Sequence, residues 1–409
     1  MNILLISAYF PPDTGSAAHL FYELGTALVN MGHQVTVLTS FPSYHAQGDL
    51  SRYRGKRYME EDVEGIRVVR VKVPQFPRHI PAGRALWQFS LALSFSFAAF
   101  KISTPDVCLV YSPPLPLGYT AWFLKKRKGV PFILNVQDLF PKSAIDLGIL
   151  KNKALIKFFE AMERWIYRHS DLITVHSPLN RDHVVMKGGV PERVEVIPNW
   201  VDTNFVKPGS RKNGFREEWK LGDQFVVSFA GIMGYSQDLD VVIESACKLR
   251  YYSDIKFLLV GDGVKKESLK KKVISLKLNN VSFIPMQPRK RYPLVLQASD
   301  ICLVTLKKNV LSPVVPSKLL SIMAAGRPVI ACLPQEGDAP KIIKEAQCGY
   351  CLEAGDVEGL SRAIIDLYKN PVLRRKFGEN GRRYAEKNFS LDICSQKYEL
   401  VFKRILGLS

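Results

Sequence analysis

The stretch 312–331, SPVVPSKLLSIMAAGRPVIA, places one lysine, Lys318, at the start of an apolar helix-forming run that contains no carboxylate. Pro316 and Ser317 precede it and are typical of a helix start, with Ser317 a candidate N-cap. Free N–H groups and the helix dipole make that end positive, so a lysine there is unfavourable unless an anion shares the place. A diphosphate would satisfy both the amides and Lys318. The stretch therefore predicts a diphosphate site.

Glycine-containing turns between a strand pattern and a helix pattern occur at three other places. They read PPDTGSAA (11–18), GIMGYSQDLD (231–240) and GDG (261–263). Such turns expose backbone amides at a helix start and suit a phosphate or an acceptor oxygen, although each is also an ordinary strand–helix turn. None has the G-x-G-x-x-G spacing of a dinucleotide site. The candidate ligand-binding residues of these turns are Gly15, Ser16, Gly231, Gly234, Ser236 and Gly261.

The carboxylates of the sequence include one candidate catalytic residue and few candidate metal ligands. In the stretch VQDLFP (136–141) a strand pattern ends at Gln137-Asp138. Catalytic residues of such folds lie at the carboxyl edge of the parallel sheet, so Asp138 is a candidate catalytic residue. The alternative is that Asp138 caps a helix. Asp238 and Asp240 spell D-x-D, but at a helix start a cap is the better interpretation of Asp238. The single C-x-x-C at 348–351 has no second pair, so we expect structural cysteines and no metal site.

The remaining pattern alternates strands and helices twice. Strand patterns cover 2–7, 32–41, 66–73, 106–112, 131–138, 172–177 and 194–199; after a polar linker at 199–214 they resume at 225–231 and 255–263. This predicts an α/β protein with two Rossmann-like, doubly wound parallel sheets facing across a cleft. We expect domains at 1–200 and 201–384 and a helical tail, 385–409, that crosses back onto the first domain.

Composition narrows the classes of protein. The chain has 409 residues, is 47% hydrophobic, carries a net charge of +19 and has 7 cysteines without disulfide-like spacing. Basic knots at 125–128, 270–272, 289–291 and 374–376 would attract polyanions or form a solvated face. No nucleic-acid docking motif accompanies them, so a basic nucleic-acid-binding protein is a remote alternative. The start, MNILLISAYF, has no signal-peptide pattern, and we expect a cytoplasmic protein with reduced thiols.

One apolar segment, 85–100, is shorter than the roughly 20 residues of a bilayer span. It contains Trp87, Phe89, Phe95, Phe97 and Phe100, and the basic run KKRK (125–128) follows a helix pattern that holds Trp122 and Phe123. Aromatic side chains beside cations suit an anionic membrane surface. An ordinary buried helix is the equal alternative. We expect peripheral membrane attachment without a span.

The ordered set PPDTGSAAHLFYELG, NVQDLFPKSAIDLGIL, VIPNWVD, FAGIMGYSQDLD, LLVGDG, PSKLLSIMAAGRPVIA and NGRRYAEKNFS resembles the family 4 retaining glycosyltransferases of GT-B fold. It is most similar to bacterial O-antigen, capsule and colanic-acid transferases, including the fucosamine-type enzymes. The resemblance covers nearly the whole chain. It implies transfer from a nucleotide-diphosphate sugar, with a UDP-sugar or UDP-N-acetyl-aminosugar favoured, to a lipid-linked glycan, without metal or cofactor.

The resemblance also implies roles for individual residues. Asp138 and Lys318 would be catalytic, with Lys318 and Ser317 at the diphosphate of the donor. His19 and Gln137 would lie on the acceptor side, and Met286 would lie near the base of the nucleotide. The remaining implied donor-binding residues are Gly15, Ser16, Gly231, Gly234, Ser236 and Gly261.

The sequence departs from the family pattern at several of these places. The two acids of the family's E-x7-E are replaced by Pro313 and Ser321, and an Arg and a Lys after the first strand of the second domain by Ile232 and Gln237. The usual His-Asp pair is Gln137-Asp138. A subfamily with a different donor-binding set explains this better than a degraded enzyme, and Lys318 then carries more of the diphosphate charge. Another GT-B enzyme, such as a sugar-nucleotide epimerase or a phosphorylase, is the main alternative.

Overall fold

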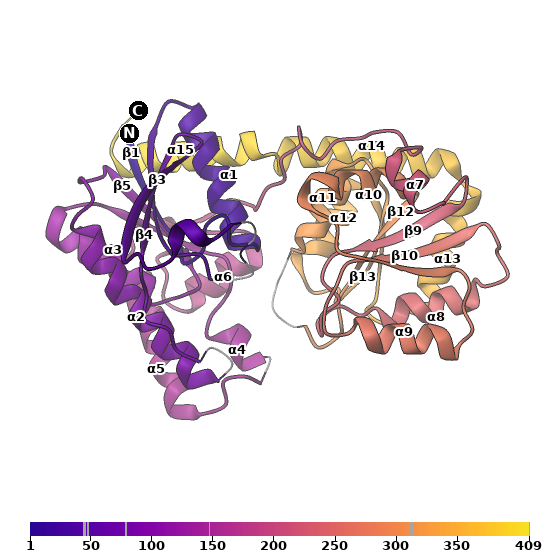
Figure 1. The fold of residues 1–409 in the computed structure, drawn as a ribbon, viewed down its shortest axis with the longest axis horizontal. Coiled ribbons are helices and arrows are strands. Elements are labelled where there is room, and N and C mark those ends of the chain that lie inside the picture. The colour runs from indigo at the N-terminus through magenta and orange to yellow at the C-terminus, as the bar shows by residue number, and fades with distance from the viewer. Residues whose placement is uncertain (44–45, 47–48, 78–79, 147, 311–314, 409) are drawn as a thin grey trace. The chain divides into compact units, whose positions relative to one another are not determined.

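We describe the protein from a computed structural model, which places all residues except 44–45, 47–48, 78–79, 147, 311–314 and 409. The chain forms two compact units, shown in Figure 1. Unit 1 comprises Met1–Asn199 and Leu391–Ser409, and unit 2 comprises Trp200–Ser390. Each unit is an α/β layer structure with its own hydrophobic core.

In unit 1 the described residues form an eight-stranded sheet in the order β3-β4-β2-β1-β5-β6-β7-β8. Neighbouring strands are parallel except at one edge, where β3 runs antiparallel to β4. The strands are β1 (Asn2–Ile6), β2 (Gln34–Ser40), β3 (Tyr58–Val63), β4 (Ile66–Val71), β5 (Val107–Ser112), β6 (Phe132–Val136), β7 (Leu172–Val175) and β8 (Val194–Val196).

The strand β3 corrects the expectation of a wholly parallel first sheet. Its sequence, YMEEDV, alternates exposed with half-buried residues, because it is an edge strand that carries charges toward solvent. The sequence pattern also did not predict several short elements, such as the helix α4 (Lys142–Asp146) and a 3₁₀ turn at Ser51–Tyr53. These short elements do not change the doubly wound architecture.

Helices cover both faces of the unit 1 sheet, as Figure 1 shows. Alternate strand residues point to opposite faces, so Leu4 and Ile6 pack into the core that includes α2, α3 and α5, whereas Leu5 faces α1. The buried residues of β5 and β6 are apolar almost throughout, as expected for strands covered on both sides. The helices are α1 (Ser16–Asn30), α2 (Pro81–Ala99), α3 (Leu117–Lys128), α4 (Lys142–Asp146), α5 (Lys153–His169), α6 (Pro178–Met186) and α15 (Leu391–Ile405).

In unit 2 the described residues form a six-stranded parallel sheet in the order β11-β10-β9-β12-β13-β14. The chain order reverses between β9 and β12, which is the switch point where ligands bind in doubly wound sheets. The strands are β9 (Phe225–Ala230), β10 (Ile255–Val260), β11 (Val281–Ile284), β12 (Ile301–Thr305), β13 (Val329–Cys332) and β14 (Gly349–Leu352).

The two faces of this sheet bury different helices. Phe225, Val227 and Phe229 of β9 pack with α8, α9 and α13, whereas Val226 and Ala230 face α7 and α10. Figure 1 shows α8 and α9 on one side of the sheet and α10 and α11 on the other. The helices are α7 (Gly214–Glu218), α8 (Asp240–Lys248), α9 (Lys266–Ser275), α10 (Tyr292–Ala298), α11 (Ser317–Ala324), α12 (Asp338–Ala346), α13 (Val357–Lys369) and α14 (Pro371–Asn388).

The C-terminal segment belongs to both units. Helix α14 packs on α11 of unit 2, and the helix breaks at Phe389-Ser390, where Val201 donates to the carbonyl oxygen of Phe389. Helix α15 then packs against α1 of unit 1 (Figure 1). Its buried Tyr398 hydroxyl accepts a hydrogen bond of 2.7 Å from the Asn135 side chain of β6. The last helix is therefore part of the core of the first unit.

Candidate functional site

Two glycines at the carboxyl ends of adjacent strands hold the backbones of unit 2 unusually close together. Gly231 follows β9 and Gly261 follows β10, with φ angles of 142° and 145°. A Cβ atom on Gly261 would lie 1.9 Å from the carbonyl oxygen of Gly231. A side chain at either position would be strained, and at Gly261 it would also strike the neighbouring backbone. These glycines open the edge of the sheet at its switch point.

The side chain of Lys318 fills the space beside the first of these glycines. A Cβ atom on Gly231 would lie 2.3 Å from Lys318 Cε and 2.9 Å from Nζ. The ammonium also lies 5.1 Å from the ring centroid of Phe229, within reach of a cation–π interaction. Burial lowers the pKa of Lys318. Among the residues that the structure describes, Lys318 has no ion-pair or hydrogen-bond partner, so a half-buried cation is left available for an anion.

The expectation that Ser317 caps this helix is wrong. Helix α11 begins at Ser317 itself, its N-cap is Pro316, and the cap makes no side-chain hydrogen bond. The first turn of any helix leaves N–H groups without intrahelical partners. Ser317 is exposed, and Ser321, at one of the two family glutamate positions, donates to its carbonyl oxygen at 3.4 Å. The other position, Pro313, lies outside the described residues.

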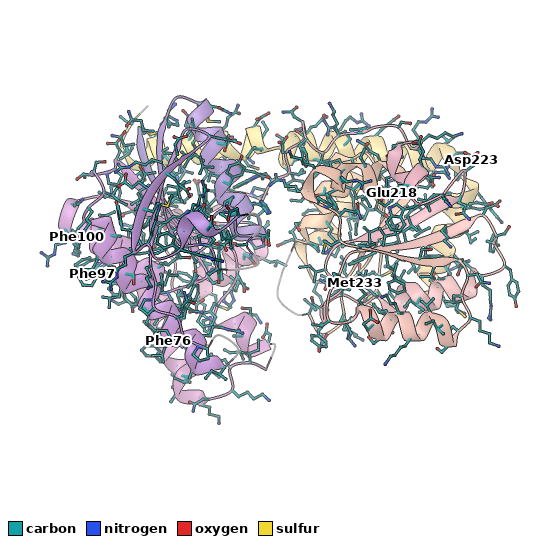
Figure 2. The ribbon with its side chains drawn as sticks, viewed as in Figure 1. Phe76, Phe97, Phe100, Glu218, Asp223 and Met233 are labelled. Atoms are coloured by element: carbon teal, nitrogen blue, oxygen red, sulfur yellow. The ribbon has the colours of Figure 1, made fainter. Side chains whose placement is uncertain are left out.

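The loop after Gly231 is held in place mainly by backbone contacts. Met233 is buried within unit 2 (Figure 2), and its N–H donates to the carbonyl oxygen of Asp262 at 2.7 Å. Gly234 donates its N–H to Gln237 Oε1 at 3.1 Å. The carbonyl oxygen of Ser236 accepts from the N–H of Lys307 at 2.9 Å. Gln237, which departs from the family pattern, therefore shapes the loop that carries Gly234 and Ser236.

Asp238 lies directly before Leu239, the N-cap residue of helix α8. Burial raises its pKa, and the neighbouring Asp240 raises it further, whereas Lys307 and the N–H of Val241 oppose the rise. Helix α8 begins at Asp240, after an N-cap, Leu239, that makes no side-chain bond. Among the described residues, no group of three or more His, Cys, Asp or Glu side chains could hold a metal ion.

Met286 lies two residues beyond the end of β11, at the same carboxyl edge as Gly231 and Gly261, and its side chain is 47% exposed. The structure therefore gathers the predicted residues of unit 2 at one edge of one sheet. Lys318 lies against Gly231, Gly231 lies against Gly261, and Ser317 precedes Lys318 in the sequence. Gly234 and Ser236 belong to the loop that leaves Gly231. This edge can accept a phosphorylated ligand.

Unit 1 has a pocket of about 840 Å³ at the carboxyl edge of its own sheet. Its lining comes from loops that follow four different strands, with Tyr9 after β1, Ser43 after β2, Phe76 after β4 and Pro113 after β5. Trp87 from α2 forms one wall and stacks on Tyr9, with ring centroids 5.9 Å apart. Aromatic walls with a few polar groups are typical of sugar-sized ligand pockets.

Gly15 lines this pocket, whereas the other residues predicted around it are only nearby. Gly15 is the N-cap of α1 and has a φ of 131°. Its loop is fixed by Arg70, which is fully buried, is ion-paired with Glu61 and donates to the carbonyl oxygen of Pro11. The side chain of Ser16 lies outside what the structure describes. His19 lies one turn further along α1, its N–H donating to the carbonyl oxygen of Gly15 at 3.2 Å.

Asp138 follows β6 at the same sheet edge and is not among the lining residues of the pocket. Asp138 is exposed at the surface, yet the protein atoms packed around its carboxyl group partly desolvate it and raise its pKa, although Ser143 Oγ, which donates to it at 3.1 Å, and the N–H of Leu139 lower it. Burial raises the pKa of the Tyr111 hydroxyl, and the charge of Asp138 adds to that rise. Gln137 Oε1 accepts a hydrogen bond of 2.7 Å from Asn199. Gln137 thus has a structural partner, and Asp138 is the available acid.

The apolar segment 85–100 forms part of α2, and only one side of it is exposed. Trp87 and Phe95 are buried in the core, so these two aromatic residues of the segment are not available to a membrane. The exposed fractions are 54% for Leu86, 60% for Leu93, 67% for Phe97 and 38% for Phe100. Figure 2 shows Phe97 and Phe100 at the outer edge of unit 1. Across the described residues, none of the helices combines the length and apolar character that crossing a bilayer requires.

The basic run KKRK also divides in two. Lys125 is ion-paired with Asp171 at 2.6 Å, and Lys128 Nζ donates to backbone carbonyls, including that of Ile102 at 2.7 Å. These two cations stabilise the fold. Lys126 and Arg127 are exposed, and Arg127 lies 5.4 Å from the ring centroid of Phe123, which itself contacts Phe100. The free cations and the exposed face of α2 are therefore continuous.

Several residues of these sites were not predicted from the sequence. Tyr9, Gln75, Phe76 and Arg84 line the unit 1 pocket but follow strands without a recognisable motif. Their one signal was position, since each lies just beyond a strand end or at a helix start near the carboxyl edge. Lys307, which anchors Ser236, carried no signal.

Comparison with known families and structures agrees with this architecture. The description "Glycosyl transferase 4-like domain" matches residues 14–200, and "Glycosyl transferases group 1" matches residues 211–384. Together the two matches cover most of both units.

Individual proteins are similar along the full length. The glycosyl transferase WcaI of Escherichia coli K12, a protein named for colanic acid biosynthesis, is 25% identical over 95% of this chain and 96% of its own. The sucrose-phosphate synthase of Thermosynechococcus elongatus has a TM-score of 0.77 at 17% identity, covering 100% of this chain and 99% of its own. HepE of Anabaena, solved with UDP, has a TM-score of 0.74 at 16% identity, and the match covers 99% of this chain and 100% of the HepE chain.

Proposed function

Because the chain belongs to the glycosyltransferases that join a glycosyl transferase 4-like domain to a group 1 domain in a GT-B fold, we propose that it is a retaining enzyme. It transfers a sugar from a nucleotide-diphosphate donor to a lipid-linked glycan during cell-surface polysaccharide synthesis. WcaI, named for colanic acid biosynthesis, supports the polysaccharide assignment. The UDP bound in HepE supports a UDP-sugar, with an N-acetyl-aminosugar as the candidate group transferred.

The observation that carries the proposal is the half-buried ammonium of Lys318, which lies against Gly231 without an ion-pair or hydrogen-bond partner among the described residues. In the reaction the bond between the anomeric carbon and the diphosphate oxygen breaks, and negative charge grows on the diphosphate. A fixed cation and the free amides of the first turn of α11 would stabilise the transition state, in which this charge has grown, more than they stabilise the bound donor in the ground state. Gly231 and Gly261 would let the diphosphate approach the backbone, as the glycine-rich phosphate loops of other proteins do. The loop with Gly234 and Ser236 and the exposed Met286 would complete the nucleotide site.

The acceptor is assigned to unit 1. The pocket there has the aromatic walls of Trp87 and Tyr9 and includes Gly15, and His19 and Gln137 lie nearby. Asp138 has a raised pKa, so its carboxylate is a better base than an ordinary aspartate for the proton that the acceptor hydroxyl loses. The proposal requires no cofactor, and it assigns to Lys318 and the helix amides the charge stabilisation that a metal ion provides in other transferases.

A lipid-linked acceptor places the enzyme at a membrane surface. The exposed Leu93, Phe97 and Phe100 beside Lys126 and Arg127 form the surface that would bind it. Apolar side chains would enter the headgroup layer while the cations bind anionic lipids, each cation contributing about 1 kcal/mol. We therefore propose peripheral attachment on the cytoplasmic side of the plasma membrane.

The test is mass spectrometry and NMR of products formed from UDP-, GDP- and dTDP-sugars with a polyprenol-linked acceptor extract. Release of the nucleoside diphosphate together with a product of unchanged anomeric configuration supports the proposal. Inversion at the anomeric carbon would refute the retaining assignment. A new sugar nucleotide formed without any acceptor would identify a sugar-nucleotide epimerase instead.

A further inference from the structure

A second cavity, this one in unit 2 and of about 660 Å³, lies at the amino end of the unit 2 sheet. It is lined by six arginines, namely Arg211, Arg327, Arg374, Arg375, Arg382 and Arg383. Asp300 and Glu379 are its lining carboxylates. We call it the arginine cavity. Such an excess of one charge inside a concave surface is costly unless an anion shares the space.

The arginine cavity is distinct from the proposed donor site. Asp300 directly precedes β12, and Arg327 precedes β13, so these residues mark the amino edge of the parallel sheet. Gly231 and Gly261 mark the carboxyl edge. Helix α11 separates the two places, since Lys318 lies in its first turn and Arg327 follows its end, about 12 Å away along the axis of an eight-residue helix.

The carboxylates do not neutralise the arginines. Asp300 is already bound by Arg211 at 2.9 Å and by Arg216 at 2.9 Å, and it also accepts the N–H of Val226. Glu379 is exposed and has no ion pair among the described residues. The one remaining carboxylate, that of Glu379, therefore cannot balance the positive charges of the other arginines, namely Arg327, Arg374, Arg375 and Arg383.

Several guanidinium groups are held in place by partners that carry no charge. Arg374 donates to the carbonyl oxygen of Tyr368 at 3.3 Å, and Arg327 Nη2 donates to that of Gly209 at 2.9 Å. The Nε atom of Arg327 is buried and has no hydrogen-bond partner in the structure. Burial lowers the pKa of both Arg327 and Arg374. An oriented, half-buried guanidinium with an unused donor fits an oxyanion.

Helix α14 brings the arginines together because of its spacing and a close contact. Arg375 and Arg382 lie seven residues apart and so share one face of the helix, whereas Arg374 and Arg383 flank that face on either side. Gly378 lies between them, and a Cβ atom there would be 2.2 Å from the carbonyl oxygen of Gly326. The helix therefore lies directly on the backbone before β13. The cavity is a built feature of unit 2, whereas solvated lysines and arginines on a loop would not hold this geometry.

We propose that the arginine cavity binds an anion with two or more phosphoryl groups, at a site separate from the sugar donor. Paired guanidinium groups bind phosphoryl oxygens in a bidentate manner, and the volume exceeds the needs of one phosphate. The ligand could be a free phosphorylated metabolite or a phosphorylated lipid headgroup, which share this chemistry. The inference goes beyond the proposed function and does not depend on it.

The test is calorimetric titration of the full chain with inorganic pyrophosphate. The Lys318→Met variant is used as the background, so that the proposed donor site does not contribute. We expect one pyrophosphate per chain, and binding weakened more than about tenfold by Arg375→Ala together with Arg383→Ala, because two charge-assisted contacts are lost. Both arginines are exposed, so folding should persist, which circular dichroism checks.

The matched control removes two exposed cations of unit 2 that lie outside the cavity, Arg250→Ala with Lys271→Ala. An equal loss in this control, or no pyrophosphate binding in the Lys318→Met background, would overturn the proposal. Vesicles containing phosphatidic acid distinguish the two sources. Binding to vesicles that the Arg375–Arg383 pair abolishes supports the lipid headgroup, whereas vesicle binding that this pair leaves unchanged supports the free anion.

Discussion

The side chain of Lys318 lies against the backbone of Gly231, with which it shares the space that any Cβ atom at position 231 would occupy. The two residues are far apart in the sequence, and each explains the other. Glycine leaves room for the lysine stem beside β9, and the lysine brings a cation to the strand end where the sheet reverses its order. A phosphorylated ligand at this edge would contact both.

Replacing Gly231 with alanine should therefore damage the proposed donor site directly. The new Cβ atom would lie 2.3 Å from Lys318 Cε, and the alanine would have to keep a φ of 142°, which L-residues rarely adopt. We expect donor affinity to fall more than about tenfold and stability to fall by on the order of 1–3 kcal/mol. The measurements are donor titration and urea unfolding.

Gly214→Ala is the matched control for this change. Gly214 begins α7, and no atom lies within 4 Å of a Cβ atom built there. This variant should bind the donor like the wild type. If Gly231→Ala also bound like the wild type, the Lys318–Gly231 contact would have no part in donor binding.

Asp138→Asn should abolish most of the transferase activity and leave the protein at least as stable. The reason is the raised pKa of Asp138. Because the folded protein holds this proton more tightly than the unfolded chain, wild-type stability falls as pH rises from the unfolded value near 3.8 through the raised folded value. The Asp138→Asn variant does not lose stability in this way. Its stability relative to the wild type should therefore increase across that pH range and stay constant above it.

Thermal unfolding at a series of pH values and turnover at neutral pH test this expectation together. Ser143 can still donate to the amide oxygen, so the local hydrogen bond is preserved. Full turnover in Asp138→Asn would remove Asp138 from the reaction. A variant that loses stability relative to the wild type at neutral pH would contradict the electrostatic argument.

At the carboxyl edge of the unit 2 sheet, the sequence predicted which residues gather better than it predicted how they contact one another. Lys318 and Gly231 each carried a local signal, a cation at a helix start and a glycine after a strand. Their contact could not be predicted, because it depends on how β9 and α11 meet in three dimensions. The β3 strand was missed because its charged, half-exposed residues resemble a loop.

The two surface features show the same limit. The apolar segment 85–100 was recognised, but its aromatic residues were treated alike, although helical phase places Trp87 and Phe95 in the core and Leu93 and Phe97 outside. The arginines of α14 resembled a solvated basic run. Only the packing of α14 on the backbone at Gly326 turns them into the lining of a cavity.

Membrane binding should depend on the exposed face of α2 and on two cations. In liposome co-sedimentation we expect binding to rise with anionic lipid and to fall with salt. Leu93→Ser with Phe97→Ser should weaken it, and so should Lys126→Ala with Arg127→Ala. The control is Arg54→Ala with Arg57→Ala, which removes two exposed cations from another part of unit 1.

A protein that stays in the supernatant at low salt would contradict the peripheral attachment. So would a protein that needs detergent to leave the membrane. Lys125 and Lys128 are unsuitable targets, because their contacts with Asp171 and with backbone carbonyls stabilise the fold.

Activity should survive a chelator. No cluster of three or more potential metal ligands occurs in the part of the chain that the structure describes, and the proposal assigns the leaving-group charge to Lys318. We expect turnover after treatment with EDTA to match that of the untreated enzyme. Complete loss with EDTA, restored by Mg²⁺ or Mn²⁺, would mean that a metal ion takes this role.

The central claim, that Lys318 binds the diphosphate of a sugar nucleotide, is tested most directly by titrating UDP, GDP and dTDP into the wild type and the Lys318→Met variant. The lowered pKa means that folding holds this proton less tightly than the unfolded chain, so replacing the charged lysine should leave the melting temperature unchanged or raised. We predict that the wild type binds one of the three nucleotides, less well as pH rises through the lowered pKa, and that the folded variant binds it more than about tenfold more weakly. Equal affinity in the two proteins, or no binding of any of the three to the wild type, would contradict the account.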